Sequence, residues 1–162
     1  GASLCETERL ETCKEILERA KSMGVTIHLP IDAVIADRFA PDANTQIASS
    51  DQIEDSWMGL DIGPKAIQAF SDVLLQSKTI LWNGPMGVFE MPAFEAGTKN
   101  IALAVAQATK NGAFSLIGGG DSAAAVQQFN LSAEVSYVST GGGALLEYFE
   151  GKTLPGVQAL EA

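Results

Sequence analysis

The last third of this chain contains the same local pattern twice: a short apolar run, three consecutive glycines and the start of a helix. FSLI leads into Gly118–Gly120 with a helix expected near Asp121, and YVST leads into Gly141–Gly143 with a helix expected near Ala144. Three glycines let the backbone approach a ligand closely, and the helix that follows directs unpaired N–H groups toward it. One such loop is explained by a tight turn alone, but two in neighbouring units favour phosphate binding.

The rest of the chain also alternates between helix and strand patterns. Apolar residues recur at helical spacing in three stretches: Ser3–Met23, the residues from Pro64 onward, and the region from Ile101 to Ala108. Three shorter apolar runs are expected as strands: 25–30, 31–36 and 79–82. Because the strands alternate with helices and no hairpin dipeptide joins two strand patterns, the sequence predicts an α/β fold with a Rossmann-like open parallel sheet. Helices should cover both faces of this sheet, giving three layers.

Local signals predict where several elements end. Ser3 and Glu6 have the spacing of a capping box, and Gly24 suits the end of the first helix. Residues 111–112, Asn-Gly, are expected to close the third helix. The run NGPMGVFEMP has too many Gly and Pro residues for regular structure, and the polar stretch 41–55 is expected to cross the surface as a loop.

Length and charge exclude several classes of function. The chain has 162 residues, enough for one domain, and its net charge of -10 argues against nucleic acid as a partner. It has neither an apolar run of about 18 residues nor a signal-peptide pattern, so we expect a protein without a membrane span that is not secreted. On one helix Cys5 and Cys13 would be about 12 Å apart, too far for a disulfide, and we expect them to fill a helix face in a reducing compartment. The chain starts at Gly1 rather than Met, which suggests a piece of a longer protein.

A dinucleotide-binding oxidoreductase is the main alternative. Gly118, Gly120 and Ala123 fit G-x-G-x-x-A after a strand and before a helix. That fingerprint also requires an acidic residue about 20 positions later to bind a ribose, and 138–143 contains none. The second loop has Leu146 where a small residue belongs, and a Walker A sequence is absent.

Three polar residues have competing interpretations. Asp121 follows the glycines, where it either caps the helix or binds Mg²⁺ on a phosphate. Ser122 either caps the same helix or donates its hydroxyl to a phosphate. His28 is the only histidine, and no Cys lies close to it in the sequence, so we interpret it as structural.

Several motifs together resemble phosphoglycerate kinase. They are LPIDAVIADRF at 29–39, WMGLDIGP at 57–64, WNGPMGVFE at 82–90, GGGDS at 118–122, STGGGA at 139–144 and GKTLPGV at 151–157. They occur in the family's order along essentially the whole chain, and WNGPMGVFE alone is highly specific. The resemblance assigns residues 1–162 to a portion of the family's C-terminal nucleotide-binding domain, with a sheet that is incomplete relative to that domain and with the N-terminal phosphoglycerate-binding domain absent.

The resemblance also implies the base and sugar contacts of a nucleotide, ADP or ATP. The implied adenine pocket consists of Gly59, Leu60, Pro85, Gly87 and Val88. Glu90 matches the carboxylate that binds the ribose hydroxyls. Without the resemblance, these residues would be interpreted as packing residues and a surface charge.

The phosphate end is implied by the glycine loops. Asn83 matches a phosphate-side contact, Gly119–Ser122 match the cradle for phosphate and Mg²⁺, and Asp121 is the implied metal ligand. Gly120 and Gly143 match the glycines whose N–H groups face the transferring phosphoryl group, and we treat them as the candidate catalytic residues.

The implied reaction is phosphoryl transfer between 1,3-bisphosphoglycerate and ADP, giving 3-phosphoglycerate and ATP, in a cytoplasmic monomer. The attacking carboxylate is already ionised at neutral pH, so the reaction needs positioning and neutralisation of charge rather than a base. All ten basic residues of this chain lie outside the glycine loops. The family's lysine-bearing segments and basic N-terminal domain are missing, and we therefore expect the chain alone to be inactive.

Overall fold

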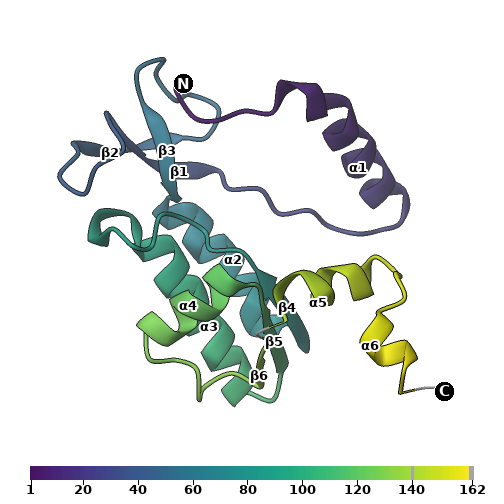
Figure 1. Ribbon diagram of the computed structural model, residues 1–162. Coiled ribbons are helices and arrows are strands. Elements are labelled where there is room, and N and C mark those ends of the chain that lie inside the picture. Colours follow the sequence, from purple (N-terminus) through teal and green to yellow (C-terminus); the bar gives the residue numbers. More distant parts are fainter. Residues whose placement is uncertain (140, 161–162) are drawn as a thin grey trace.

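The computed structural model describes residues 1–139 and 141–160, which form two separate three-stranded sheets (Figure 1). The first sheet is antiparallel, in the order β2-β1-β3, and consists of β1 (Asp32–Ala36), β2 (Thr45–Ser49) and β3 (Met58–Ile62). The second sheet is parallel, in the order β4-β5-β6, and consists of β4 (Thr79–Asn83), β5 (Phe114–Gly118) and β6 (Tyr137–Val138).

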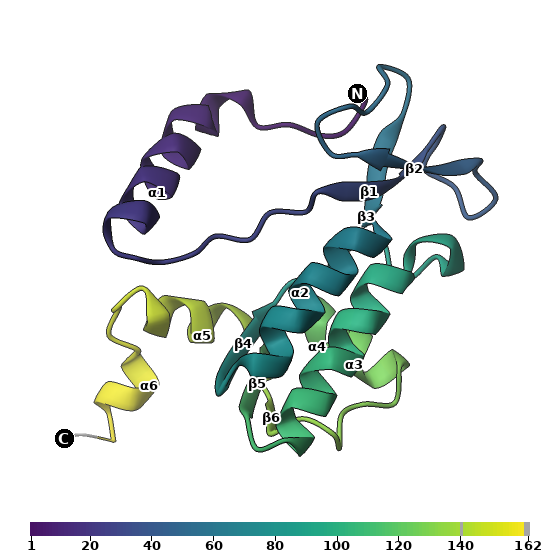
Figure 2. The same cartoon turned by 180° about the vertical axis from the view of Figure 1, so that it is seen from behind.

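Helices cover one face of the parallel sheet, and a further helix reaches the other face at the end of β5. One face is covered by α2 (Pro64–Gln76), α3 (Ala96–Lys110) and α4 (Gly120–Gln128), and the core lies between these helices and the sheet (Figures 1 and 2). Ile80 and Trp82 point into this core, as does Ile117. Leu145 of α5 (Gly142–Phe149) reaches the opposite face at Gly118. The predicted α/β class with an open parallel sheet is confirmed.

The antiparallel sheet corrects the expectation that every strand would be parallel. Residues 31–36 form a strand, but β1 pairs antiparallel with both β2 and β3. The stretch 41–55, expected as a loop, contains β2, whose residues are mostly exposed and therefore lack an apolar alternation.

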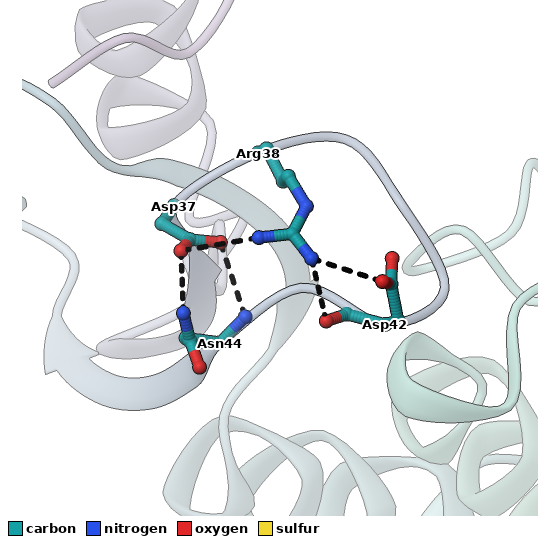
Figure 3. Close-up of polar contacts among 4 residues, drawn as sticks. All are labelled: Asp37, Arg38, Asp42 and Asn44. Atoms are coloured by element: carbon teal, nitrogen blue, oxygen red, sulfur yellow. Dashed lines mark hydrogen bonds and ion pairs between the residues drawn. The ribbon is translucent and has the colours of Figure 1, made fainter.

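A polar cluster closes the hairpin between β1 and β2 in place of a two-residue turn (Figure 3). The Asp37 carboxylate accepts hydrogen bonds from the Asn44 backbone N–H at 3.0 Å and from Asn44 Nδ2 at 2.7 Å. Arg38 forms ion pairs with Asp37 at 3.6 Å and with Asp42 at 3.1 Å. The Asn44 side-chain bond is the largest influence that lowers the pKa of Asp37. A long hairpin loop of this kind carries no turn dipeptide, which is why the sequence pattern did not reveal it.

The first third of the chain differs from the prediction. The Ser3–Glu6 capping box is wrong: η1 (Thr7–Arg9) precedes α1 (Leu10–Ser22), and Ser3 Oγ instead accepts the Gly59 N–H at 2.9 Å. Residues 25–30 were predicted as a strand and form none, because no neighbouring strand in the described ranges pairs with them. α1 buries no residue, and it stands away from both sheets in Figures 1 and 2.

Two smaller expectations are also settled. Cys5 and Cys13 are exposed free thiols, and Cys5 precedes the helix, so the separation expected for a shared helix does not apply. The remaining elements are η2 (Pro92–Phe94) and α6 (Pro155–Gln158). α3 ends at Lys110 with Asn111 as its C-cap, and Gly112 follows with φ of 97°, as the Asn-Gly pair predicted.

A buried carboxylate from β1 caps α2. Pro64 occupies the first turn, as predicted, and Asp32 accepts the N–H groups of Lys65 at 3.0 Å and Ala66 at 2.8 Å. Asp32→Ala should lower the free energy of unfolding by about 1–3 kcal/mol, because both N–H groups lose their acceptor. Urea denaturation of the chain and of the complete protein measures this.

Asp72→Ala is the matched control for that variant. Asp72 is exposed on the same helix and accepts only the Gln68 side chain, so its loss should cost no more than about 0.5 kcal/mol. Equal unfolding midpoints for the two variants would show that the Asp32 cap contributes nothing.

Candidate functional site

A surface cavity of about 370 Å³ brings the predicted adenine-pocket residues together. One wall is β3, with Gly59 and Leu60, and the other is the loop after β4, with Pro85, Gly87 and Val88. The two walls are joined by the Val88 N–H, which donates to the Leu60 carbonyl at 2.9 Å. The cavity is also lined by Pro30, Asp32, Ala33, Ser50, Ile53, Asp61, Ile62 and Met86. Its size lies at the lower end of the range for small-molecule sites.

The loop wall is fixed by hydrogen bonds rather than by regular structure. Thr98 Oγ1, from the first turn of α3, accepts the N–H groups of Met86 at 3.0 Å and Gly87 at 3.2 Å. The Trp82 indole N–H donates to the Gly84 carbonyl at 2.7 Å. Phe89 is buried and anchors the far end of the loop. The loop wall is therefore held by the start of α3 and by contacts of its own residues.

Asp61 is a buried acid in the lining of this cavity, and no sequence motif singled it out. Its carboxylate accepts the Gly97 N–H at 2.6 Å and the Ile62 N–H at 2.8 Å. Burial raises its pKa to about 6, and the two backbone hydrogen bonds only partly oppose the effect of burial. An acid inside the otherwise apolar strand MGLDI was the available signal, because an acid buried in a strand is rare unless it has partners.

The predicted phosphate-end residues lie together where β4 and β5 end. Asn83 and Gly118 are register partners in these parallel strands. Gly119 has φ of 86°, and a Cβ added there would lie 2.6 Å from Asn83 Oδ1, so only glycine fits. Gly120 begins α4, and nothing lies within 4 Å of where its Cβ would be, which leaves its backbone accessible.

Asp121 lies in the first turn of α4 and is exposed. Its alternative role as the N-cap is wrong, because the N-cap residue is Gly119 and no side-chain capping bond is formed. Its carboxylate forms no ion pair or hydrogen bond with another side chain among residues 1–139 and 141–160. Mg²⁺ at a nucleotide typically takes one or two protein carboxylates, with phosphate oxygens and water completing the shell. An exposed acid at this position fits that ion.

Ser122 has a different environment from Asp121. It is fully buried, and its Oγ accepts the Gly84 N–H at 2.6 Å. The capping alternative is therefore wrong for Ser122 as well. This bond ties the first turn of α4 to the loop that forms the cavity wall.

The two remaining predicted residues lie at the margins of the site. Glu90 is exposed at the end of the cavity loop, next to Phe89, whose carbonyl accepts Gln128 Nε2–H at 3.1 Å. Gly143 lies in the first turn of α5, with nothing within 4 Å of its virtual Cβ. The lining of the 370 Å³ cavity does not include Glu90, Gly143 or the glycine-loop residues.

His28 does not belong to this site. It lines a separate apolar cavity of about 250 Å³ between α2, α3 and the free edge of β4.

In the described ranges, no helix is long and apolar enough to cross a membrane. No group of three or more metal-ligating side chains occurs in that part of the chain either.

Comparison with known proteins gives a consistent result. The family model described as "Phosphoglycerate kinase" matches residues 1–152. The phosphoglycerate kinase of Chloroherpeton thalassium is 57% identical over 160 residues, which are 99% of this chain and 40% of that protein. Cytosolic phosphoglycerate kinase 3 of Arabidopsis thaliana is 53% identical over 161 residues, again 99% of this chain and 40% of the relative.

A solved structure agrees with the sequence comparisons. The structure of phosphoglycerate kinase from Coxiella burnetii superposes with a TM-score of 0.91 at 42% identity, covering 98% of this chain and 40% of that one. The chain thus spans about 40% of the length of the relatives it matches. Because the family model and these relatives follow it almost from end to end, this chain belongs to the phosphoglycerate kinase family.

Proposed function

We propose that this chain supplies the nucleotide-binding side of a phosphoglycerate kinase, which transfers a phosphoryl group reversibly between 1,3-bisphosphoglycerate and ADP in glycolysis. The observation that carries this proposal is the connection between the base cavity and the glycine loop. Loop 84–88 follows Asn83 directly, and the Gly84 N–H bond to Ser122 links it to α4. A base in the cavity therefore places its phosphates toward Asn83 and the start of α4.

The chemistry follows from this arrangement. The acceptor carboxylate of 3-phosphoglycerate is ionised at neutral pH, so the protein has to align the reactants and stabilise charge. The N–H groups at Gly120 and Gly143, in the first turns of α4 and α5, face the transferring phosphoryl group in this proposal. Ser122 contributes by holding Gly84, since its buried hydroxyl oxygen already accepts that N–H.

Asp121 is the residue that we assign to Mg²⁺. When bound, Mg²⁺ neutralises charge on the nucleotide phosphates and orients them for transfer. The first-turn N–H groups of α4 bind phosphate in either case, so the carboxylate is required for the metal rather than for the nucleotide alone.

Binding measurements test the proposal directly. We expect the complete protein to bind Mg-ADP and Mg-ATP in preference to NAD, with the base cavity of this chain supplying the adenine site. Calorimetric titrations with ADP, ATP and NAD, with and without Mg²⁺, on the complete protein and on this chain measure the preference. Tighter binding of NAD would support the oxidoreductase alternative and overturn the proposal.

Glu90 provides a test of the sugar end. Glu90→Gln should weaken ADP binding by about 1.5–3 kcal/mol, because the ribose hydroxyls lose a charged acceptor. An ADP analogue without the ribose hydroxyls should lose much less, and calorimetry with both ligands measures the difference. Equal losses for the two ligands would make Glu90 an ordinary surface charge.

The resemblance also implies a cytoplasmic, monomeric enzyme. Named relatives include a cytosolic and a chloroplastic phosphoglycerate kinase of Arabidopsis thaliana. Localisation and oligomeric state stay predictions, and the binding of phosphoglycerate by a separate N-terminal domain is part of the proposal.

A further inference from the structure

The side chain of Asp61 lies where three segments around the base cavity meet. It belongs to β3, it accepts the N–H of Gly97 in the first turn of α3, and it lies against Gly87 of the loop wall. A Cβ at Gly87 or at Gly97 would overlap the Asp61 carboxylate. Both positions therefore require glycine because this side chain occupies the space between them.

The bond to Gly97 reaches the cavity wall through the neighbouring residue. Thr98 follows Gly97 and is fully buried, and its Oγ1 accepts the N–H groups of Met86 and Gly87. Asp61 thus fixes the first turn of α3, and that turn fixes the loop. The opposite wall, Gly59–Leu60, lies on the same strand as Asp61, so Asp61 belongs to one wall and its side chain contacts the other at Gly87.

Asp32 is a second buried carboxylate in the lining of the same cavity. It is equally buried and also accepts two backbone N–H groups, but one segment, the start of α2, supplies both of them. Each of these carboxylates joins a strand to the start of a helix, but Asp61 also lies against Gly87 of the loop wall. No Lys or Arg accompanies Asp61: burial and two backbone hydrogen bonds are the influences on its pKa. A buried acid without a cation is costly, and the Asp61 carboxylate is placed against the loop wall as well as at the start of a helix.

We propose that Asp61 is a positioning residue for the nucleotide base, acting through Gly97 and Thr98 on loop 85–88. This inference rests on the proposed function, because it assumes that the cavity holds the base. It predicts an effect confined to the base end of the ligand. The phosphate end is built by β4, β5 and α4, and Asp61 forms no hydrogen bond to these elements.

Asp61→Asn in the complete enzyme tests the proposal. Asn keeps the shape and one acceptor oxygen, but its NH₂ group opposes one of the two N–H donors. We expect the Kd of Mg-ADP and the KM of Mg-ATP to rise about tenfold, with turnover at saturating nucleotide within about twofold of the parent. Magnesium tripolyphosphate, which has no base, should bind with its Kd changed by no more than about twofold.

Two further variants separate positioning from stability. Val105→Ala removes core packing from the same helix outside the base cavity, so it should lower the melting temperature without changing either Kd. Thr98→Val should reproduce the selective loss for Mg-ADP, whereas Thr98→Ser should retain parental affinity. The double variant with Asp61→Asn should lose little more than the larger single loss, because both residues act on the same loop.

The outcomes distinguish this inference from the function on which it rests. If Asp61→Asn lowers the melting temperature and leaves Mg-ADP affinity unchanged, Asp61 is only a helix anchor. If it weakens Mg-ADP and tripolyphosphate equally, its effect is not on the base, and the inference is likewise wrong. If the parent enzyme itself gains no affinity from the adenosine part of ADP, the cavity is not a base site and the proposed function fails first.

Discussion

Asp121→Asn in the complete enzyme is expected to lower turnover with Mg-ATP by about 10²–10³-fold, by analogy with the loss of one preorganised electrostatic group. Asn is neutral and cannot provide the negative ligand that fixes Mg²⁺ while charge moves between nucleotide and acceptor. Affinity for metal-free ADP should stay the same or rise slightly, because repulsion between the carboxylate and bare phosphates is removed. Steady-state kinetics and calorimetry without metal measure the two effects.

In the structure, Asp121→Asn removes a charge without removing a helix cap. Gly119 is the N-cap of α4, so the substitution removes no capping bond. The stability cost is limited to the interaction of an exposed charge with the helix dipole, about 0.3–1 kcal/mol. Asp72→Asn, an exposed helical acid outside the site, is the control and should leave turnover unchanged. A lower melting temperature with turnover within about twofold of the parent would show that Asp121 is structural.

The chain alone is expected to turn over no acyl phosphate. Kinases typically turn over about 1–100 substrate molecules per second, so the expected loss is complete. Neither the base cavity nor the glycine loops contain a Lys or Arg side chain to neutralise the transferring phosphoryl group. A coupled assay on the purified chain measures the expected inactivity. Turnover at an ordinary kinase rate would refute the argument.

The free edge of β4 gives a second reason for that inactivity. In the described part of the chain, β4 pairs only with β5, and the apolar cavity beside it is open. Leu81 of β4 is 44% exposed, and α1 contributes no buried residue although Leu10, Ile16 and Leu17 are apolar. Monomeric proteins rarely expose large contiguous apolar patches. We propose that the N-terminal portion implied by the family resemblance covers this surface as the preceding portion of the protein; the chain has about 40% of its relatives' length.

Adding that preceding portion as a separate polypeptide should restore measurable turnover. Leu81→Glu should prevent restoration, because it places a charge against the surface that must be covered. Leu103→Glu is the matched control: Leu103 is exposed to a similar extent, 47%, but lies on α3 away from the β4 cavity. Restoration that is insensitive to Leu81→Glu would show that the partner binds elsewhere.

Local chemistry allowed the sequence to predict the elements that position the phosphate end. The two strand-glycine-helix units, Pro64 in the first turn of α2 and the Asn-Gly end of α3 all depend on residues close in the chain. Gly59, Leu60, Pro85, Gly87 and Val88 were predicted by resemblance, and the structure places them around one cavity. Their ligand contacts, and those of Asn83, Glu90 and Gly143, stay predictions.

Tertiary structure decided what depended on distant partners. The run 25–30 has strand character, but a strand forms only where a neighbour satisfies its backbone groups. β1 pairs antiparallel with β2 and β3, and no signal within its own residues specifies the direction of that pairing. The Asp61 carboxylate and the Ser122 hydroxyl accept hydrogen bonds from the N–H groups of Gly97 and Gly84. Both partners are far away in the sequence. The sequence by itself determined which residues could turn, cap or approach a phosphate, because those properties are local. Only the tertiary structure decided which buried polar groups would find partners, since hydrogen bonds between distant segments depend on how the whole chain packs.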